Sequence, residues 1–195
     1  MSPSYFYATQ VSARPESDDR EWGLYFTKNS LTEDEARARY GRDPRDRENG
    51  FIGVVRLADG EDRPRSYLRV GPRANGMELE KLNQHGTVVA SYTWRAYAEG
   101  EQQETPSTER VFLGTIAYYG YPDEDGFWPL RKSIGSVMTI FRENGYVKED
   151  TNQRAPMGEA DAVTTREFEE VDVSVNWFDI PEFGDWEAFF HPEGE

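Results

Sequence analysis

The chain has 195 residues, a length that suits one domain better than two. It carries 37 acidic and 22 basic side chains, and the resulting net charge of −15 argues against direct binding to nucleic acid. The absence of cysteine and the presence of only two histidines exclude disulfides, thiol nucleophiles, and thiolate or all-histidine metal sites within the chain. Hydrophobic content is only 36%, but 14% of the residues are aromatic and large enough to build a core.

The acidity is unevenly distributed along the chain. Residues 1–75 carry thirteen basic and thirteen acidic side chains, whereas residues 76–195 carry nine basic and twenty-four acidic ones. Such polarisation favours solubility and charged partners. The excess of arginine over lysine, 18 to 4, leaves open a proteome-wide compositional bias as its origin.

The sequence shows no secretory signal and no membrane-spanning segment. No apolar run approaches the ~18 residues that a membrane-spanning helix needs. The N-terminal residues 1–7 lack the basic region and apolar stretch of a secretory signal. We therefore expect a cytoplasmic protein without a membrane partner.

Alternating apolar residues predict strands along most of the chain. In chain order, the predicted strands are 5–11, 22–26, 51–57, 66–70, 87–97, 110–119 and 170–177. The Asp59-Gly60 turn signal joins 51–57 to 66–70 as a hairpin, and 77–84 is ambiguous between helix and strand. In the last predicted strand, Val171 and Val173 point to the core, so Glu170 and Asp172 point to solvent.

Two segments carry helix signals, and a third is a candidate for a single helical turn. Thr32 to Glu35 forms a capping box before a short helix that ends at Gly41. A longer helix is predicted from Pro129 to Asn144, on a stripe of apolar residues at helical spacing: Leu130, Ile134, Val137, Met138 and Phe141. A helical turn follows residues 181–184.

Together these elements predict a single domain over residues 1–195 of the α+β class. We expect an antiparallel β-rich meander or sandwich of about seven or eight strands. One main helix packs on a sheet face, and short helical turns complete the fold. The acidic and aromatic C-terminal segment, residues 181–195, is a candidate for a peripheral element.

Motifs that carry chemistry are weak in this sequence. No phosphate-binding glycine loop and no nucleophile elbow occurs. Asp123 to Gly126 resembles a calcium loop but lacks the downstream glutamate, so it is interpreted as a turn. His85 and His191 lie in a turn and near the C-terminus, where histidines are usually surface residues. We therefore assign no catalytic residue, metal site or cofactor, and the balance favours a protein that is not an enzyme.

The C-terminal segment gives the most specific functional hypothesis. Trp186, Phe189 and Phe190 fall at i, i+3 and i+4 with Glu187 among them, a pattern that suits either an anchor in a partner's groove or a turn folded onto its own sheet. We expect a non-catalytic acidic protein that binds a basic surface on a partner protein, as an inhibitor, immunity-type protein or nucleic-acid mimic does. The predicted partner-binding residues are Glu170, Asp172, Trp186, Glu187, Phe189 and Phe190.

Two alternatives stay open. One is a structural subunit of a larger, virion- or tail-like assembly, in which long strands continue a sheet across copies. The other is a carboxylate-based enzyme or small-molecule binder with an aromatic cleft, lined by Trp22, Tyr92, Trp94, Tyr118 and Tyr119. The sequence leaves the oligomeric state and the partner's identity undecided.

Overall fold

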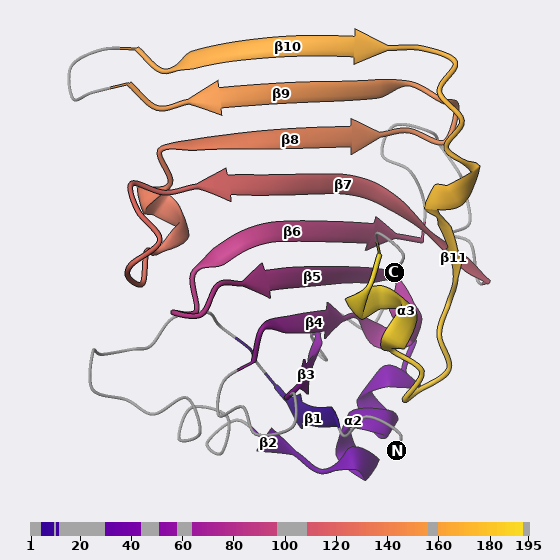
Figure 1. Cartoon of the computed structure of the whole chain (residues 1–195). Helices are drawn as coiled ribbons and strands as arrows, with labels where there is room; N and C mark the ends of the chain where they lie inside the picture. Colours follow the sequence, from indigo (N-terminus) through magenta and orange to yellow (C-terminus); the bar gives the residue numbers. More distant parts are fainter. Residues whose placement is uncertain are drawn as a thin grey trace.

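A computed structural model describes residues 5–9, 11, 30–43, 51–57, 64–96, 109–155 and 160–192. These residues form one open antiparallel sheet of eleven strands, in the order β10-β9-β8-β7-β6-β5-β4-β3-β1-β2, with β11 paired to β7 (Figure 1). The strands are β1 (Tyr5–Ala8), β2 (Ser30–Leu31), β3 (Ile52–Arg56), β4 (Ser66–Val70), β5 (Gly76–Leu82), β6 (Val88–Arg95), β7 (Arg110–Gly120), β8 (Gly135–Phe141), β9 (Val147–Gln153), β10 (Ala162–Phe168) and β11 (Trp177–Asp179). The helices are α2 (Glu33–Tyr40) and α3 (Glu187–Phe190), with short 3₁₀ turns at Pro72–Ala74, Leu130–Lys132 and Ser174–Asn176.

Several predicted elements are confirmed. The capping box holds at α2, where the Thr32 hydroxyl accepts from the Glu35 N–H and the Glu35 side chain accepts from the Thr32 N–H. The hairpin of β3 and β4 and the two long strands β6 and β7 are present, and the ambiguous segment is strand β5. The sheet has eleven strands, more than the predicted seven or eight. The predicted strand at 22–26 lies outside the described residues.

The predicted helix from Pro129 to Asn144 is wrong, because this segment contains strand β8. Apolar residues occur at both odd and even positions of β8, since both faces of this strand are partly covered, and together they imitate a helical stripe. Asn144-Gly145 is the tip of the β8–β9 hairpin instead of a helix end. Gly145 has φ +83°, the left-handed conformation that such a turn requires. This segment was the main helix expected on a sheet face. The described residues contain no such helix, and the short helices α2 and α3 pack on the sheet instead.

The predicted strand at 170–177 is also wrong. After β10 the chain turns at Glu170, which has φ +58°, and a 3₁₀ turn at Ser174–Asn176 leads into the short strand β11. Val173 is buried as expected, but Val171 is 37% exposed and Val175 is 79% exposed. The conformation of this segment depends on tertiary pairing. The chain crosses from the sheet edge back to β7 instead of adding a strand beside β10.

The main core lies on one sheet face, where β3 to β7 meet α2 and α3. Strand register places Leu68, Leu79 and Tyr92 side by side on this face, and Trp94 follows on the same strand as Tyr92. The helix α3 lies against β4 on this face (Figure 1). A smaller cluster occupies the opposite face, formed by Ala8, Val11, Val55, Tyr67, Leu82 and Val88.

The sheet has a covered half and an uncovered half. Every residue of β8 is partly exposed and every residue of β10 is exposed, so neither face of this end carries a full second layer. A third, small cluster of Phe112, Val147 and Val173 lies where the chain after β10 passes the ends of β7 and β9. The sheet therefore changes across its strands, from a part that a second layer covers, β3 to β7, to a part that stands as a single layer, β8 to β10.

The contrast between buried and exposed C-terminal residues gives a stability prediction. Trp186 is fully buried, so Trp186→Ala should lower the free energy of unfolding by about 3–5 kcal/mol. Val175→Ala, at an exposed position of the same segment, should change it by less than about 0.5 kcal/mol. Urea denaturation measures both values. Equal effects of the two substitutions would contradict the packing described here.

Candidate functional site

The predicted aromatic stripe of the C-terminal segment lies inside the protein. Trp186, Phe189 and Phe190 are 0%, 2% and 4% exposed. Phe189 packs edge-on against Trp94 at 5.4 Å between ring centres, and Trp186 does the same against Tyr40 at 5.3 Å. This is the arrangement of a terminal turn folded onto its own sheet. The hypothesis that these three side chains bind a partner stays a prediction.

Glu187 lies at the surface and connects α3 to the first strands. Its carboxylate contacts Arg56 Nη1 at 2.6 Å, accepts a hydrogen bond from the Tyr5 hydroxyl at 3.0 Å, and lies 3.4 Å from His191 Nε2. Burial and the neighbouring carboxylate raise the pKa of Tyr5. Both carboxylate oxygens thus hold the C-terminal helix in place, which is a structural role.

Glu170 and Asp172 are exposed, as predicted, although they lie in a turn and not in a strand. The Asp172 carboxylate accepts a hydrogen bond from the Ser174 N–H at 2.9 Å, and this bond lowers the pKa of Asp172. Together with Glu167 and Glu169, these residues make this end of the uncovered half acidic. The structure thus brings Glu170 and Asp172 together, but separates them from the buried aromatic residues.

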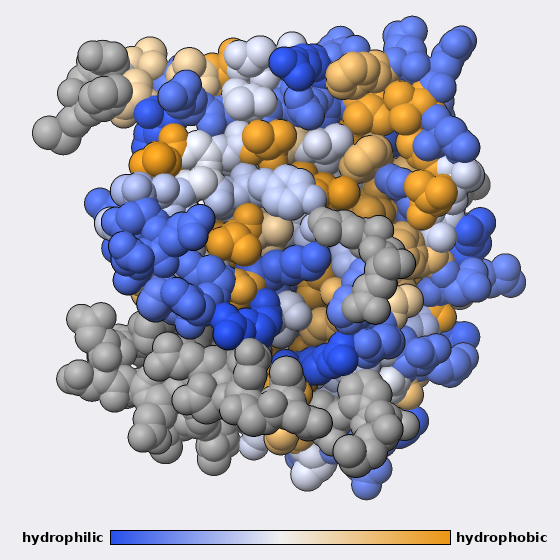
Figure 2. All heavy atoms as spheres, viewed as in Figure 1, coloured by the Kyte–Doolittle hydropathy of each residue, from blue (hydrophilic) through white to orange (hydrophobic). Residues whose placement is uncertain are grey.

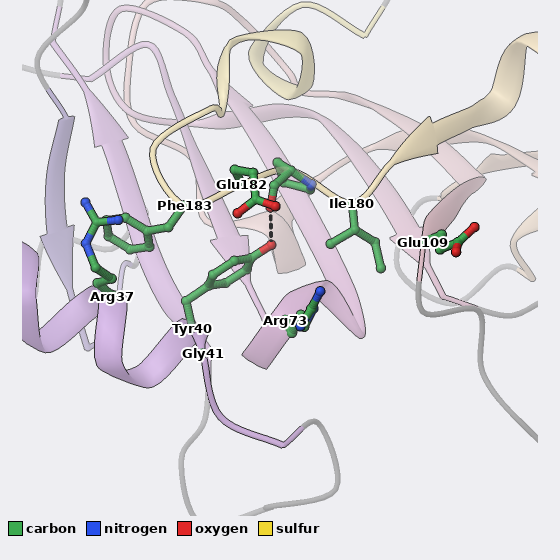
Figure 3. Close-up of a pocket in the computed structure, with 9 residues that line it drawn as sticks. Arg37, Tyr40, Gly41, Arg73, Glu109, Ile180, Glu182 and Phe183 are labelled. Carbon is green, nitrogen blue, oxygen red and sulfur yellow. Dashed lines mark hydrogen bonds between the residues drawn. The ribbon is translucent and has the colours of Figure 1, made fainter.

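A cavity of about 460 Å³ lies between the end of α2 and the segment 180–183 (Figure 3). The Tyr40 hydroxyl donates to the Pro181 carbonyl, and Arg37 stacks 4.4 Å above the Phe183 ring. Burial, together with the charge of Glu182, raises the pKa of Tyr40 to about 12. The tyrosine is therefore neutral and acts as a structural link between α2 and the C-terminal segment.

A second cavity, of about 250 Å³, lies on the opposite sheet face below the β7–β8 connection. The buried Thr87 holds this connection down, because its hydroxyl accepts from the Trp128 N–H at 2.8 Å and donates to the Gly126 carbonyl at 3.3 Å. Within the cavity the Tyr67 hydroxyl donates to the Glu80 carboxylate. Burial raises the pKa of Glu80 above its ordinary value. Sequence reasoning missed this carboxylate, because no spacing distinguishes it among thirty-seven acids.

Of the described residues predicted to line an aromatic cleft, Tyr92 packs against both Trp94 and Tyr118. Tyr92 and Trp94 are fully buried core residues. Tyr118 and Tyr119 are neighbours on β7, and adjacent strand residues face opposite sides of a sheet. Trp22 lies outside the described residues.

The uncovered half of the sheet, β8 to β10, is the surface with the most unusual exposure. Phe168 is 47% exposed and Val163 is 60% exposed, and the exposed Tyr118 and Ile134 lie on and beside the adjoining strands. Figure 2 shows apolar side chains among polar ones across this part of the molecule. Such mixed apolar and polar exposure is typical of a protein-binding surface.

Comparisons with protein-family models, curated proteins and solved structures give no match to this chain. Within the described ranges, no group of three metal-ligating side chains comes together, and no helix is long and apolar enough to cross a membrane. The exposure of β8 and β10 makes the surface of the uncovered half the candidate site.

The buried carboxylate gives a prediction of pH dependence. Because the folded protein keeps the Glu80 proton at pH values where the unfolded chain has lost it, the free energy of unfolding should fall as pH rises through that window. Glu80→Gln removes this loss, so the stability of the variant relative to the wild type should improve between about pH 4 and 7. Urea denaturation across this range measures the difference. Glu124→Gln, at an exposed loop position, is the control, and parallel curves for Glu80→Gln and wild type would refute the assignment.

Proposed function

We propose that this chain is a non-catalytic interaction protein that binds a basic surface of another protein through the uncovered half of its sheet. The single observation that carries the proposal is the exposure of strand β10 at all seven positions, valine and phenylalanine included. A strand in a stable sheet normally buries at least one face. Exposure on both faces therefore suggests a surface that a partner completes.

The charge around this surface indicates the kind of partner. The sequence from 143 to 172, which contains β9 and β10, has nine acidic and three basic side chains. Two of the three basic residues already have acidic neighbours, since Lys148 lies 2.8 Å from Asp150 and Arg166 lies 3.6 Å from Glu149. The remaining negative charge favours a basic partner, by raising the association rate and selecting against acidic competitors.

The same surface is also consistent with one alternative function. A structural subunit whose sheet continues into another copy of the chain would also leave β10 exposed before assembly. Size-exclusion chromatography with light scattering separates the two functions, because a protein that stays monomeric at high concentration is not such a subunit.

Charge reversal at the end of β10 tests the proposal. Glu169→Lys/Glu170→Lys changes two exposed residues, so it should leave the melting temperature within a few degrees of the wild type. Proteins captured by the wild-type chain from native lysate should include a basic protein whose recovery falls by about tenfold with the variant. Recovery should also fall for the wild type as salt increases.

The matched control is Glu124→Lys/Asp125→Lys, which makes the same charge change in the β7–β8 connection, at the opposite end of the strands (Figure 1). It should leave recovery unchanged. Equal loss with both variants would mean that only net charge matters, and no loss with either would refute an acidic interface at this end.

A further inference from the structure

We infer that the free edge of β10 accepts an extended strand of the partner, with basic side chains on one face and apolar side chains on the other. This inference rests on the proposed function and specifies how the partner binds. Strand addition supplies affinity through backbone hydrogen bonds and selectivity through alternate side chains.

The two edges of the sheet differ in the way that this mode of binding requires. At one end β2 is only two residues long, and such a short edge strand offers little backbone for pairing. At the other end β10 is seven residues long, and its register with β9 runs through seven pairs without a shift. Among the described residues, β10 has a neighbouring strand on the β9 side alone.

Most features that normally protect an edge strand are missing from β10. The sequence 162–168 contains no proline and no glycine, and its pairing with β9 shows no bulge. Its two charged residues, Arg166 and Glu167, have opposite signs. They therefore do not form a row of like charges that would repel an incoming strand. The Thr165 hydroxyl donates to the Asp150 carboxylate at 2.6 Å, and Arg166 lies 3.6 Å from Glu149. Two central side chains therefore have partners on β9, which is the side away from the free edge.

The residues of β10 define the chemistry of the incoming strand. One face presents Val163, Thr165 and Glu167, and the acids Asp161 and Glu169 flank the strand. An incoming strand with lysine or arginine at alternate positions would place positive charge opposite these carboxylates. The other face presents Ala162, Thr164, Arg166 and Phe168. Apolar side chains on the second face of the incoming strand would cover the exposed phenylalanine.

A second copy of this chain fits the edge poorly. Two-fold antiparallel pairing places one residue of β10 opposite its own copy, and directly opposed like charges are destabilising. The three registers that overlap most of the strand all create such pairs. Centred on Thr164, Thr165 and Arg166, they oppose Glu167 to Asp161, Asp161 to Glu169 and Arg166 to itself. The net charge of −15 adds to this repulsion.

The probe for this inference is a synthetic peptide of about seven residues, the length of β10, that alternates lysine and valine and has both ends blocked. A peptide of the same composition without alternation is its control. We expect the alternating peptide to bind at least about fivefold more tightly, as measured by fluorescence anisotropy. Hydrogen exchange should slow in residues 162–168 on binding, because outward amide groups gain partners.

Two neighbouring substitutions test the edge directly. Adjacent residues of an antiparallel strand point their N–H groups to opposite edges, so one of Thr164→Pro and Thr165→Pro removes an outward N–H and the other a bond to β9. The variant that keeps the wild-type melting temperature is the outward one, and it should lose peptide binding by at least about fivefold. If both variants unfold, protection of 162–168 in the wild type still decides the question.

Three results would overturn the inference. Equal binding of both peptides without protection of 162–168 would show electrostatic attraction alone, and binding that the outward proline variant retains would place the peptide elsewhere. Protection of 162–168 that grows with protein concentration in the absence of peptide would show that a second copy occupies the edge. The proposed function fails separately, when the Glu169→Lys/Glu170→Lys variant recovers the basic protein as well as the wild type.

Discussion

The packing of the C-terminal segment on the sheet is the interaction on which the rest of the structure depends. A single sheet has two faces and buries little apolar surface unless another layer covers it. Here Trp186, Phe189 and Phe190 cover Trp94 and its neighbours, and each buried aromatic side chain contributes about 1.5–3 kcal/mol. This layer reaches β3 to β7 but not β8 to β10, so the same contact that stabilises one half leaves the other half open.

The uncovered half is held mainly by its strand pairing, and Arg166 on β10 also forms an ion pair with Glu149 on β9. The β8–β9 and β9–β10 hairpins each pair over seven residues, and their contacts are local in sequence. Their exposed charges contribute little to stability, since surface ion pairs are worth about 0–1 kcal/mol. Acidic residues at this end therefore favour hydration of an exposed apolar surface, and they carry the charge that the proposed binding of a basic partner uses. In this way one arrangement of charge serves both solubility and the proposed recognition.

Local signals in the sequence were sufficient where a few adjacent residues decide the structure. The capping box at Thr32 and Glu35 determines the start of α2, and the alternation in β6 and β7 determines two long strands. These features depend on side-chain contacts within one or two turns or on one buried face. The candidate site was only partly accessible in this way, because the acids Glu170 and Asp172 are visible as charge whereas the exposure of β10 is not.

The sequence by itself determined the antiparallel β-rich class and the acidic end of the chain, whereas the exposure of Glu170 and Asp172 was inferred from a strand that the structure does not form. Only the tertiary structure decided that 135–141 is a strand, because its apolar residues serve two partly covered faces and this pattern resembles a helix until the neighbouring strands are known. Only the tertiary structure placed Trp186, Phe189 and Phe190 inside the protein. An aromatic stripe looks the same on a docking anchor and on a buried turn, and the difference is whether the sheet offers an uncovered apolar face within reach.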